Sequence, residues 1–233
     1  MYMNWDNLGD FAFVNTDTLK GEPKGIVLNL HGYTDGTMFD KSNAFAAKMG
    51  ENGIVYVFPY HSVWAWMSKS SMAYIEEVLD TVYKHYGFDE KTPFVISGGS
   101  MGGMTAIMYG IFGKKKPIAC TANCPVTDLE KMLSHDMTRA IYSAFILEDK
   151  PFSECVKEHS PILNISKLPK IPYRIMLGEK DTAITASALK FTEKMKQNGF
   201  DINTSVVAGM GHCNLADFAP DFNTYLQFII NAV

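Results

Sequence analysis

Short runs of apolar and β-branched residues alternate along this chain with longer segments of helical periodicity. The apolar runs cover residues 25–30, 54–58, 92–97, 118–122, 173–177 and 204–208, after a shorter run at 10–14. Strands that are covered on both faces of a parallel sheet have this composition. The helix-like segments cover residues 39–49, 70–86, 104–110, 185–198 and 215–230. The alternation predicts an α/β fold with a doubly wound, mostly parallel sheet.

Residues 128–165 interrupt the alternation, and we interpret them as a small cap-like insertion after the strand at 118–122. The chain has 233 residues, 47% of them apolar, which suffices for one sizeable core but not for a second large domain. We therefore predict a single domain over residues 1–233. The insertion carries large apolar side chains that we interpret as internal packing: Met132, Met137, Tyr142, Phe145 and Phe152.

The segment Gly98-Gly99-Ser100-Met101-Gly102 joins the strand at 92–97 to the helix that follows. A serine on a sharp strand-to-helix turn needs very small neighbours two positions before and after it, because the strand and helix nearly touch there. Such a turn exposes the serine hydroxyl and places the next backbone N–H, that of Met101, at a helix N-terminus. The pattern predicts a nucleophile elbow with Ser100 as the nucleophile.

A serine nucleophile needs a neighbouring base, and the base needs an acid that orients it. Asp181 follows the strand at 173–177, and His212 follows the strand at 204–208. Sites in parallel sheets form beyond the carboxyl ends of the strands, so we predict a triad of Ser100, His212 and Asp181. Asp128 also follows a strand and is a second candidate for the acid. We favour Asp181 because its strand is adjacent in order to that of the histidine.

The strand at 25–30 ends in a loop that begins His31-Gly32-Tyr33. A backbone N–H from a loop in this position can donate to an oxyanion, together with the N–H of Met101. We predict Tyr33 as this second donor, with Gly32 as the alternative. The His31 side chain is predicted to support the loop by hydrogen bonding.

Taken in order, His31-Gly32-Tyr33, the Ser100 elbow, Gly178-Glu179-Lys180-Asp181 and Gly211-His212 resemble the α/β-hydrolase superfamily. The resemblance extends from about residue 25 to the C-terminus. Within the superfamily the chain resembles small esterases and the catalytic domains of the prolyl-oligopeptidase-like branch, on Ser160-Pro161 and the spacing of the last two strands. This resemblance implies the α/β-hydrolase fold and carboxylic-ester or acyl hydrolysis, without choosing a substrate.

Charge and cysteine content exclude several other classes. The formal net charge is −4, and the one tight basic run, residues 114–116, suits a helix C-terminus, so we expect no nucleic-acid partner. No signal-like N-terminus and no apolar run near the roughly 18 residues of a membrane span is present, which favours a soluble cytoplasmic protein. Four cysteines without metal-ligand spacing are interpreted as reduced thiols: Cys120, Cys124, Cys155 and Cys213. We expect no metal and no cofactor.

Trp64 and Trp66 follow the strand at 54–58, at the same sheet edge as the predicted triad. They either pack under the cap or offer a stacking face to a sugar or an aromatic acyl group. The sequence thus predicts a serine esterase that forms an acyl-enzyme with a small-molecule ester, of short-chain, sugar-linked or aromatic type. Two alternatives stay open: an oligopeptidase-like serine peptidase and a catalytically silent binding protein of the same fold.

Overall fold

The computed structural model describes residues 3–133 and 137–233. Its centre is a seven-stranded sheet in the order β1-β3-β2-β4-β5-β6-β7, parallel except for β1, which pairs antiparallel with β3. The strands are β1 (Ala12–Val14), β2 (Gly25–Leu30), β3 (Ile54–Pro59), β4 (Phe94–Gly99), β5 (Ala119–Asn123), β6 (Tyr173–Gly178) and β7 (Ile202–Val207). The predicted fold class is confirmed, and most strand boundaries agree within two residues.

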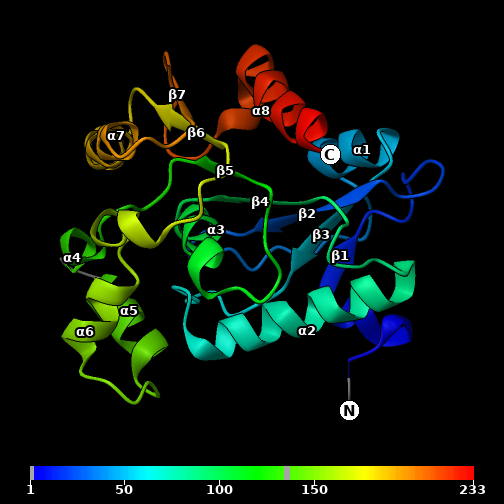
Figure 1. Ribbon diagram of the computed structural model, residues 1–233, viewed down its shortest axis with the longest axis horizontal. Helices are drawn as coiled ribbons and strands as arrows, with labels where there is room; N and C mark the ends of the chain where they lie inside the picture. The colour runs from blue at the N-terminus through cyan, green and yellow to red at the C-terminus, as the bar shows by residue number, and fades with distance from the viewer. Residues whose placement is uncertain (1–2, 134–136) are drawn as a thin grey trace.

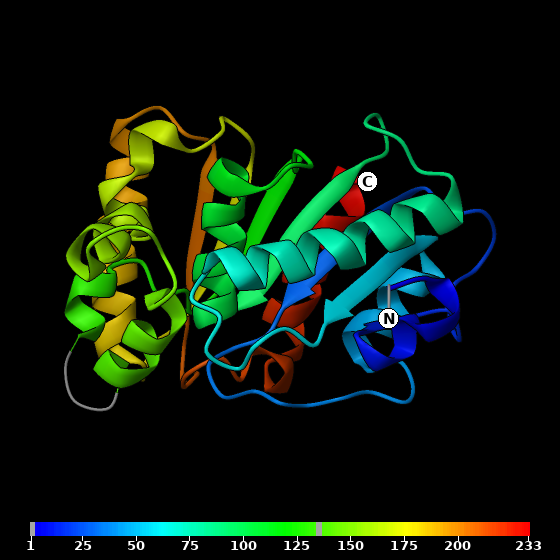
Figure 2. The ribbon, with the colours of Figure 1, turned by 90° about the horizontal axis from the view of Figure 1, so that it is seen from below.

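Five helices cover the two faces of the sheet (Figures 1 and 2). They are α1 (Ala44–Glu51), α2 (Lys69–Tyr86), α3 (Met101–Phe112), α7 (Thr182–Gln197) and α8 (Ala219–Ala232). The core between α2, α3, α7 and the sheet includes Ile75, Met104 and Phe191, whereas α1 and α8 pack on the other side with Met49 and Ile229. Burial on both faces explains why β3 is apolar throughout and why β6 is apolar apart from Arg174.

Two predicted helices begin later than the periodicity indicates, each for a local reason. The helix predicted at 39–49 begins at Ala44, because the Asn43 side chain accepts the N–H of Ala46 and caps its first turn. The helix predicted at 215–230 is divided into a short 3₁₀ turn, Leu215–Asp217, and α8. Pro220 lies in the first turn of α8, where its missing N–H and restricted φ favour a helix start.

A buried carboxylate joins the long helix α2 to α3. Glu76 is 4% exposed, and its Oε1 accepts the hydroxyl of Tyr109 at 2.8 Å and the backbone N–H of Lys114 at 2.8 Å. A buried carboxylate needs such donors to replace its lost water. The contact fixes α2 against α3, the helix that directly follows Ser100.

The segment between β5 and β6 forms α4 (Leu129–Met132), α5 (Met137–Phe145), α6 (Phe152–Glu158) and two 3₁₀ turns, Pro161–Leu163 and Ile165–Lys167. These helices gather with α7 at one end of the sheet in both ribbon views. Phe145 is buried, and the rings of Tyr142 and Phe152 lie 5.2 Å apart, as internal packing requires. We retain the single domain over 1–233 with a cap-like insertion at 128–165 as a proposal.

Within the described ranges, no helix is both long and apolar enough to cross a membrane.

Candidate active site

Ser100 lies on the sharp turn between β4 and α3, with φ 55° and ψ −117°. Few non-glycine residues adopt a positive φ, and they do so where the surroundings impose it. Here the Ser100 N–H donates to Asn123 O at 2.9 Å, and Ser100 O accepts the N–H of Val126 at 3.2 Å. Glycine is needed on both sides, because a Cβ on Gly98 would lie 2.3 Å from Gly102 O, and one on Gly102 would lie 2.1 Å from Leu30 O.

The structure brings Ser100, His212 and Asp181 together from three separate loops. His212 Nε2 lies 2.9 Å from Ser100 Oγ, and His212 Nδ1 lies 2.5 Å from Asp181 Oδ2. When the Nδ1 proton is donated to Asp181, Nε2 is left to accept the hydroxyl proton of Ser100. This is the arrangement of a nucleophile, a base and an orienting acid.

Contacts between the loops after β6 and β7 hold Asp181 and His212 at this separation. The Lys180 N–H donates to Met210 O at 2.9 Å, and the Gly209 N–H donates to Glu179 Oε2 at 2.8 Å. The second candidate acid, Asp128, lies elsewhere. Its carboxylate forms an ion pair with Lys131 at 3.1 Å and caps α4. The structure therefore pairs the histidine with Asp181 and not with Asp128.

The pKa of His212 is raised above its ordinary value. The Cys124 sulfur contributes most to this rise and the Asp181 carboxylate contributes next, against partial burial, which lowers the pKa. Both groups favour the imidazolium that forms when His212 takes a proton from a nucleophile. Such surroundings suit a residue that becomes positively charged when it accepts a proton, which is the role predicted for His212.

The loop after β2 passes directly over the elbow. A Cβ on Gly32 would lie 3.7 Å from Ser100 Cβ, which is ordinary van der Waals contact. His31 Nδ1 lies 2.9 Å from Gly32 O, and His31 Nε2 lies 2.9 Å from His61 O. The second contact connects this loop to the loop after β3. Tyr33 follows in the loop, and Met101 is the first residue of α3, where helical N–H groups point outward. The positions suit the predicted oxyanion donors, whose role stays a prediction.

A cavity of about 610 Å³ opens beside Ser100 and His212. On one side it is lined from α1, β3 and α8 by Phe45, Phe58 and Phe222. On the other side Met132 and Met137 contribute from the insertion, so these two methionines do more than pack within it. Mostly apolar walls with a few convergent polar groups are typical of small-molecule sites.

The two tryptophans have different surroundings. Trp66 is 1% exposed, lines the cavity, and packs its ring 5.9 Å from that of Tyr33. Trp64 is half-buried beneath Arg139 of α5, whose guanidinium carbon lies 5.8 Å from the ring centre, and it lines a separate, smaller hollow. The structure brings Trp66 to the candidate site and leaves Trp64 outside the cavity lining. Substrate contact by Trp66 stays a prediction.

Sequence reasoning missed several residues at this site. Asn123 is the last residue of β5 and Cys124 follows it, and Asn123 Nδ2 donates to Cys213 O at 3.1 Å beside the histidine. Their place at the carboxyl end of a strand was the available signal. Phe45 and Phe222 carried no signal of this kind, because helix periodicity separates buried from exposed residues but does not identify which buried residues reach a cavity.

A model of the prolyl oligopeptidase family matches residues 60–229, which is more than half of the chain and includes the Ser100 elbow, Asp181 and His212. The chain belongs to the prolyl oligopeptidase family. This membership confirms the resemblance to the corresponding branch of the α/β-hydrolase superfamily. No sequence among the curated proteins matches the chain.

Solved structures of α/β-hydrolase proteins share the fold of this prolyl oligopeptidase family member at low identity. An inhibited esterase B from Lactobacillus rhamnosis is 13% identical with a TM-score of 0.71, over 95% of this chain and 80% of the other. S-formylglutathione hydrolase from Staphylococcus aureus is 18% identical with a TM-score of 0.69, over 93% and 87%. Pyrococcus horikoshii acylaminoacyl peptidase is 13% identical with a TM-score of 0.75, over 94% of this chain but 38% of its own. Family and fold together support a serine hydrolase.

Proposed function

We propose that this protein is a serine esterase that hydrolyses small-molecule carboxylic esters with Ser100, His212 and Asp181 as its triad. The observation that carries the proposal is the position of the His212 ring, 2.9 Å from the serine hydroxyl and 2.5 Å from the carboxylate. Hydrogen-bond distances on both ring nitrogens are what proton transfer from the serine requires.

The reaction proceeds in two acyl-transfer steps. His212 Nε2 takes the hydroxyl proton while Ser100 Oγ bonds to the ester carbonyl carbon, and the N–H groups of Met101 and Tyr33 donate to the resulting oxyanion. The carbon–oxygen bond to the alcohol breaks, and the alcohol leaves with the proton held by His212. Water then loses a proton to His212 as its oxygen bonds to the acyl carbon. The carbon–oxygen bond to Ser100 breaks, His212 returns the proton to Ser100 Oγ, and the acid is released.

The cavity lining favours an ester over a peptide. Among its described lining residues the carboxylates are Asp35 and Asp181, and Asp181 is engaged by His212. No pair of free carboxylates is therefore available there to hold a peptide ammonium group. The aromatic wall from α1, β3 and α8 suits a short or aromatic acyl group, whose burial contributes about 25 cal/mol per Å² of apolar surface.

A serine peptidase is the second candidate, because the family model is that of the prolyl oligopeptidases. The same triad chemistry cleaves amides when the leaving amine is protonated by the histidine. A catalytically silent binding protein is less well supported, since such a protein has no need for hydrogen-bond distances on both sides of the His212 ring.

The test is hydrolysis of p-nitrophenyl esters from acetyl to decanoyl, with a feruloyl ester and a peptide anilide, by the wild type and Ser100→Ala. We expect ester cleavage with a clear acyl preference and a loss of at least about 1000-fold in kcat/KM in the variant. Anilide cleavage faster than every ester would assign the protein to the peptidases. Failure of a fluorophosphonate to label Ser100 in the folded wild type would refute the assignment of the nucleophile.

A further inference from the structure

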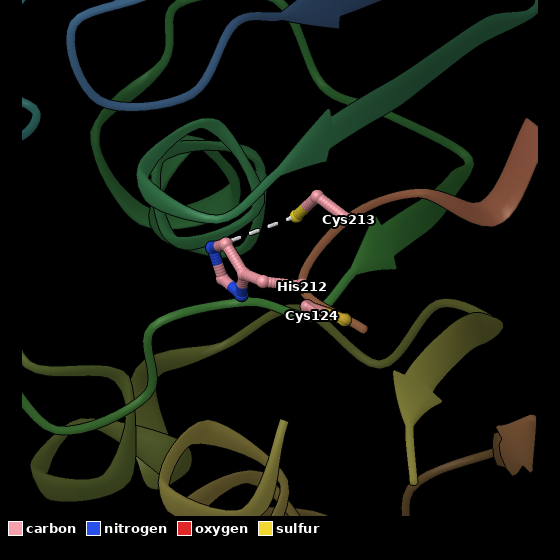
Figure 3. Close-up of side chains that lie close together, drawn as sticks. All are labelled: Cys124, His212 and Cys213. Carbon is pink, nitrogen blue, oxygen red and sulfur yellow. Dashed lines mark hydrogen bonds between the residues drawn. The ribbon is translucent and has the colours of Figure 1, made fainter. Parts of the chain in front are cut away.

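Two cysteines lie close to His212, the candidate base, one in the loop after β5 and one in the loop after β7. Cys124 directly follows β5, and Cys213 directly follows His212. One ring nitrogen of His212 and the two sulfur atoms all lie within 4.8 Å of one another. Figure 3 shows the Cys213 sulfur directed toward the imidazole, and its distance from Nε2 is 3.8 Å.

The backbone holds both thiols in place. Cys124 has φ 44° and Cys213 has φ 58°, a left-handed conformation that costs a non-glycine residue of order 1 kcal/mol and persists only where neighbours enforce it. The Cys124 N–H donates to Met176 O at 2.8 Å, and Cys213 O accepts from Asn123 Nδ2 at 3.1 Å. The two sulfurs are therefore brought to the same ring by a rigid frame.

Two sulfurs and an imidazole nitrogen are a ligand set for a thiophilic divalent cation such as Zn²⁺. Zinc–sulfur bonds near 2.3 Å and zinc–nitrogen bonds near 2.0–2.1 Å, at a tetrahedral angle, separate nitrogen from sulfur by about 3.6 Å. The 3.8 Å between His212 Nε2 and Cys213 Sγ is close to this value. Asp181 accepts a hydrogen bond from the other ring nitrogen, Nδ1, as carboxylates commonly do behind a metal-bound histidine.

We propose that Cys124, Cys213 and His212 Nε2 form an inhibitory binding site for Zn²⁺-class cations. Binding releases the two thiol protons to the solvent and leaves a fourth position open toward the cavity that His212 and Cys213 line. The metal occupies the nitrogen that otherwise accepts the proton of Ser100, so a bound cation blocks hydrolysis. This consequence for activity rests on the proposed function, whereas metal binding itself does not. The proposal differs from the expectation drawn from the sequence, in which all four cysteines are reduced thiols and no metal is bound.

The direct test uses Co²⁺ and Zn²⁺ on the whole reduced protein. We expect one Co²⁺ per chain with thiolate-to-cobalt absorption in the near ultraviolet, and displacement of Co²⁺ by Zn²⁺. Zinc affinity follows from competition with a chromophoric chelator. Cys124→Ala and Cys213→Ala should each weaken it by at least roughly 10- to 100-fold, the loss that removal of even an outer-shell partner causes.

Cys155→Ala is the matched control, because Cys155 is a buried free thiol in α6 of the insertion. It should bind Co²⁺ like the wild type. Ser100→Ala separates this proposal from the proposed function, since it should keep the cobalt spectrum whether or not the wild type hydrolyses any ester. In an active wild type, Zn²⁺ should inhibit hydrolysis and a chelator should restore it.

Three results would overturn the proposal. One is a Co²⁺ complex without thiolate absorption, and another is equal zinc affinity in the wild type and both cysteine variants. The third is inhibition that a reducing agent reverses and a chelator does not, which would point to a disulfide between Cys124 and Cys213.

Discussion

Replacement of Gly102 by alanine tests whether close contact between α3 and β2 builds the elbow. A Cβ at this position would lie 2.1 Å from Leu30 O and 2.5 Å from His31 O. Both obstacles are backbone atoms at the end of β2, in the middle of the sheet, so they cannot turn aside as a flexible side chain can. The first turn of α3 and the end of β2 must separate.

The size of the effect follows from the overlap. Carbon–oxygen contacts are comfortable from about 3.3 Å, so α3 must move by roughly 1.2 Å from Leu30 O. Overpacking in a well-packed core costs about 1–3 kcal/mol when side chains can adjust, and here the upper end or more is expected. Alanine in a helix is otherwise better than glycine by about 1 kcal/mol, which leaves a net loss near 2 kcal/mol or more. For a chain of this size the loss lowers Tm by about 4–8 °C.

The assay is thermal unfolding followed by circular dichroism, with ester hydrolysis measured on the same preparations. Gly9→Ala is the control, because a Cβ there would meet nothing within 4 Å and the residue lies on the surface. We expect Gly9→Ala to leave Tm within a degree or two of the wild type while Gly102→Ala lowers it and reduces kcat. Equal Tm values for Gly102→Ala and the wild type would refute the steric account of the elbow.

Three further predictions concern the acid, the pH dependence and a buried hydrogen bond. Asp181→Asn should lower kcat by about 10⁴-fold with unchanged circular dichroism, because the wrong His212 tautomer is then favoured; activity within tenfold of the wild type would contradict this. Burial, and then the neighbouring His31, lower the pKa of His61 to about 3. Between about pH 6.5 and this value the His61 ring is protonated in the unfolded chain but not in the folded protein. The free energy of unfolding therefore falls by up to about 1.4 kcal/mol for each unit that the pH is lowered. His61→Gln should reduce this slope in urea unfolding between pH 6.5 and 5, and an unchanged slope would exclude His61 as its source. Tyr109→Phe removes a hydrogen-bond donor from buried Glu76 and should lower the free energy of unfolding by about 1.5–3 kcal/mol in urea unfolding. An unchanged urea midpoint would contradict this.

Much of the fold was predictable from the sequence because its determinants are local. Apolar runs buried on both faces mark β2, β3, β4 and β6, and the spacing of Gly98, Ser100 and Gly102 requires a strand-to-helix turn at that point. Strands of a parallel sheet share one carboxyl edge, so the sequence alone predicts that Asp181 and His212 lie near Ser100.

Other features depended on contacts between distant segments. Strand order favoured Asp181 over Asp128, but the contacts that position Asp181 join distant segments: the loop after β6 bonds to the loop after β7, while Asp128 caps α4. The different surroundings of Trp64 and Trp66 also depend on distant segments. Trp64 lies beneath Arg139 of α5, whereas Trp66 lines the cavity, although both residues belong to one loop.

By itself the sequence determined the alternation of elements, the elbow and the types of residue available for chemistry, since backbone sterics and hydrophobic periodicity act over a few residues. Only the tertiary structure decided which groups meet at His212. Cys124 and Cys213 are separated by most of two βα units, yet their sulfurs reach the same imidazole because β5, β6 and β7 are neighbours in one sheet. Pairing of strands, and not spacing along the chain, brings both sulfurs and a nitrogen of the ring within 4.8 Å of one another.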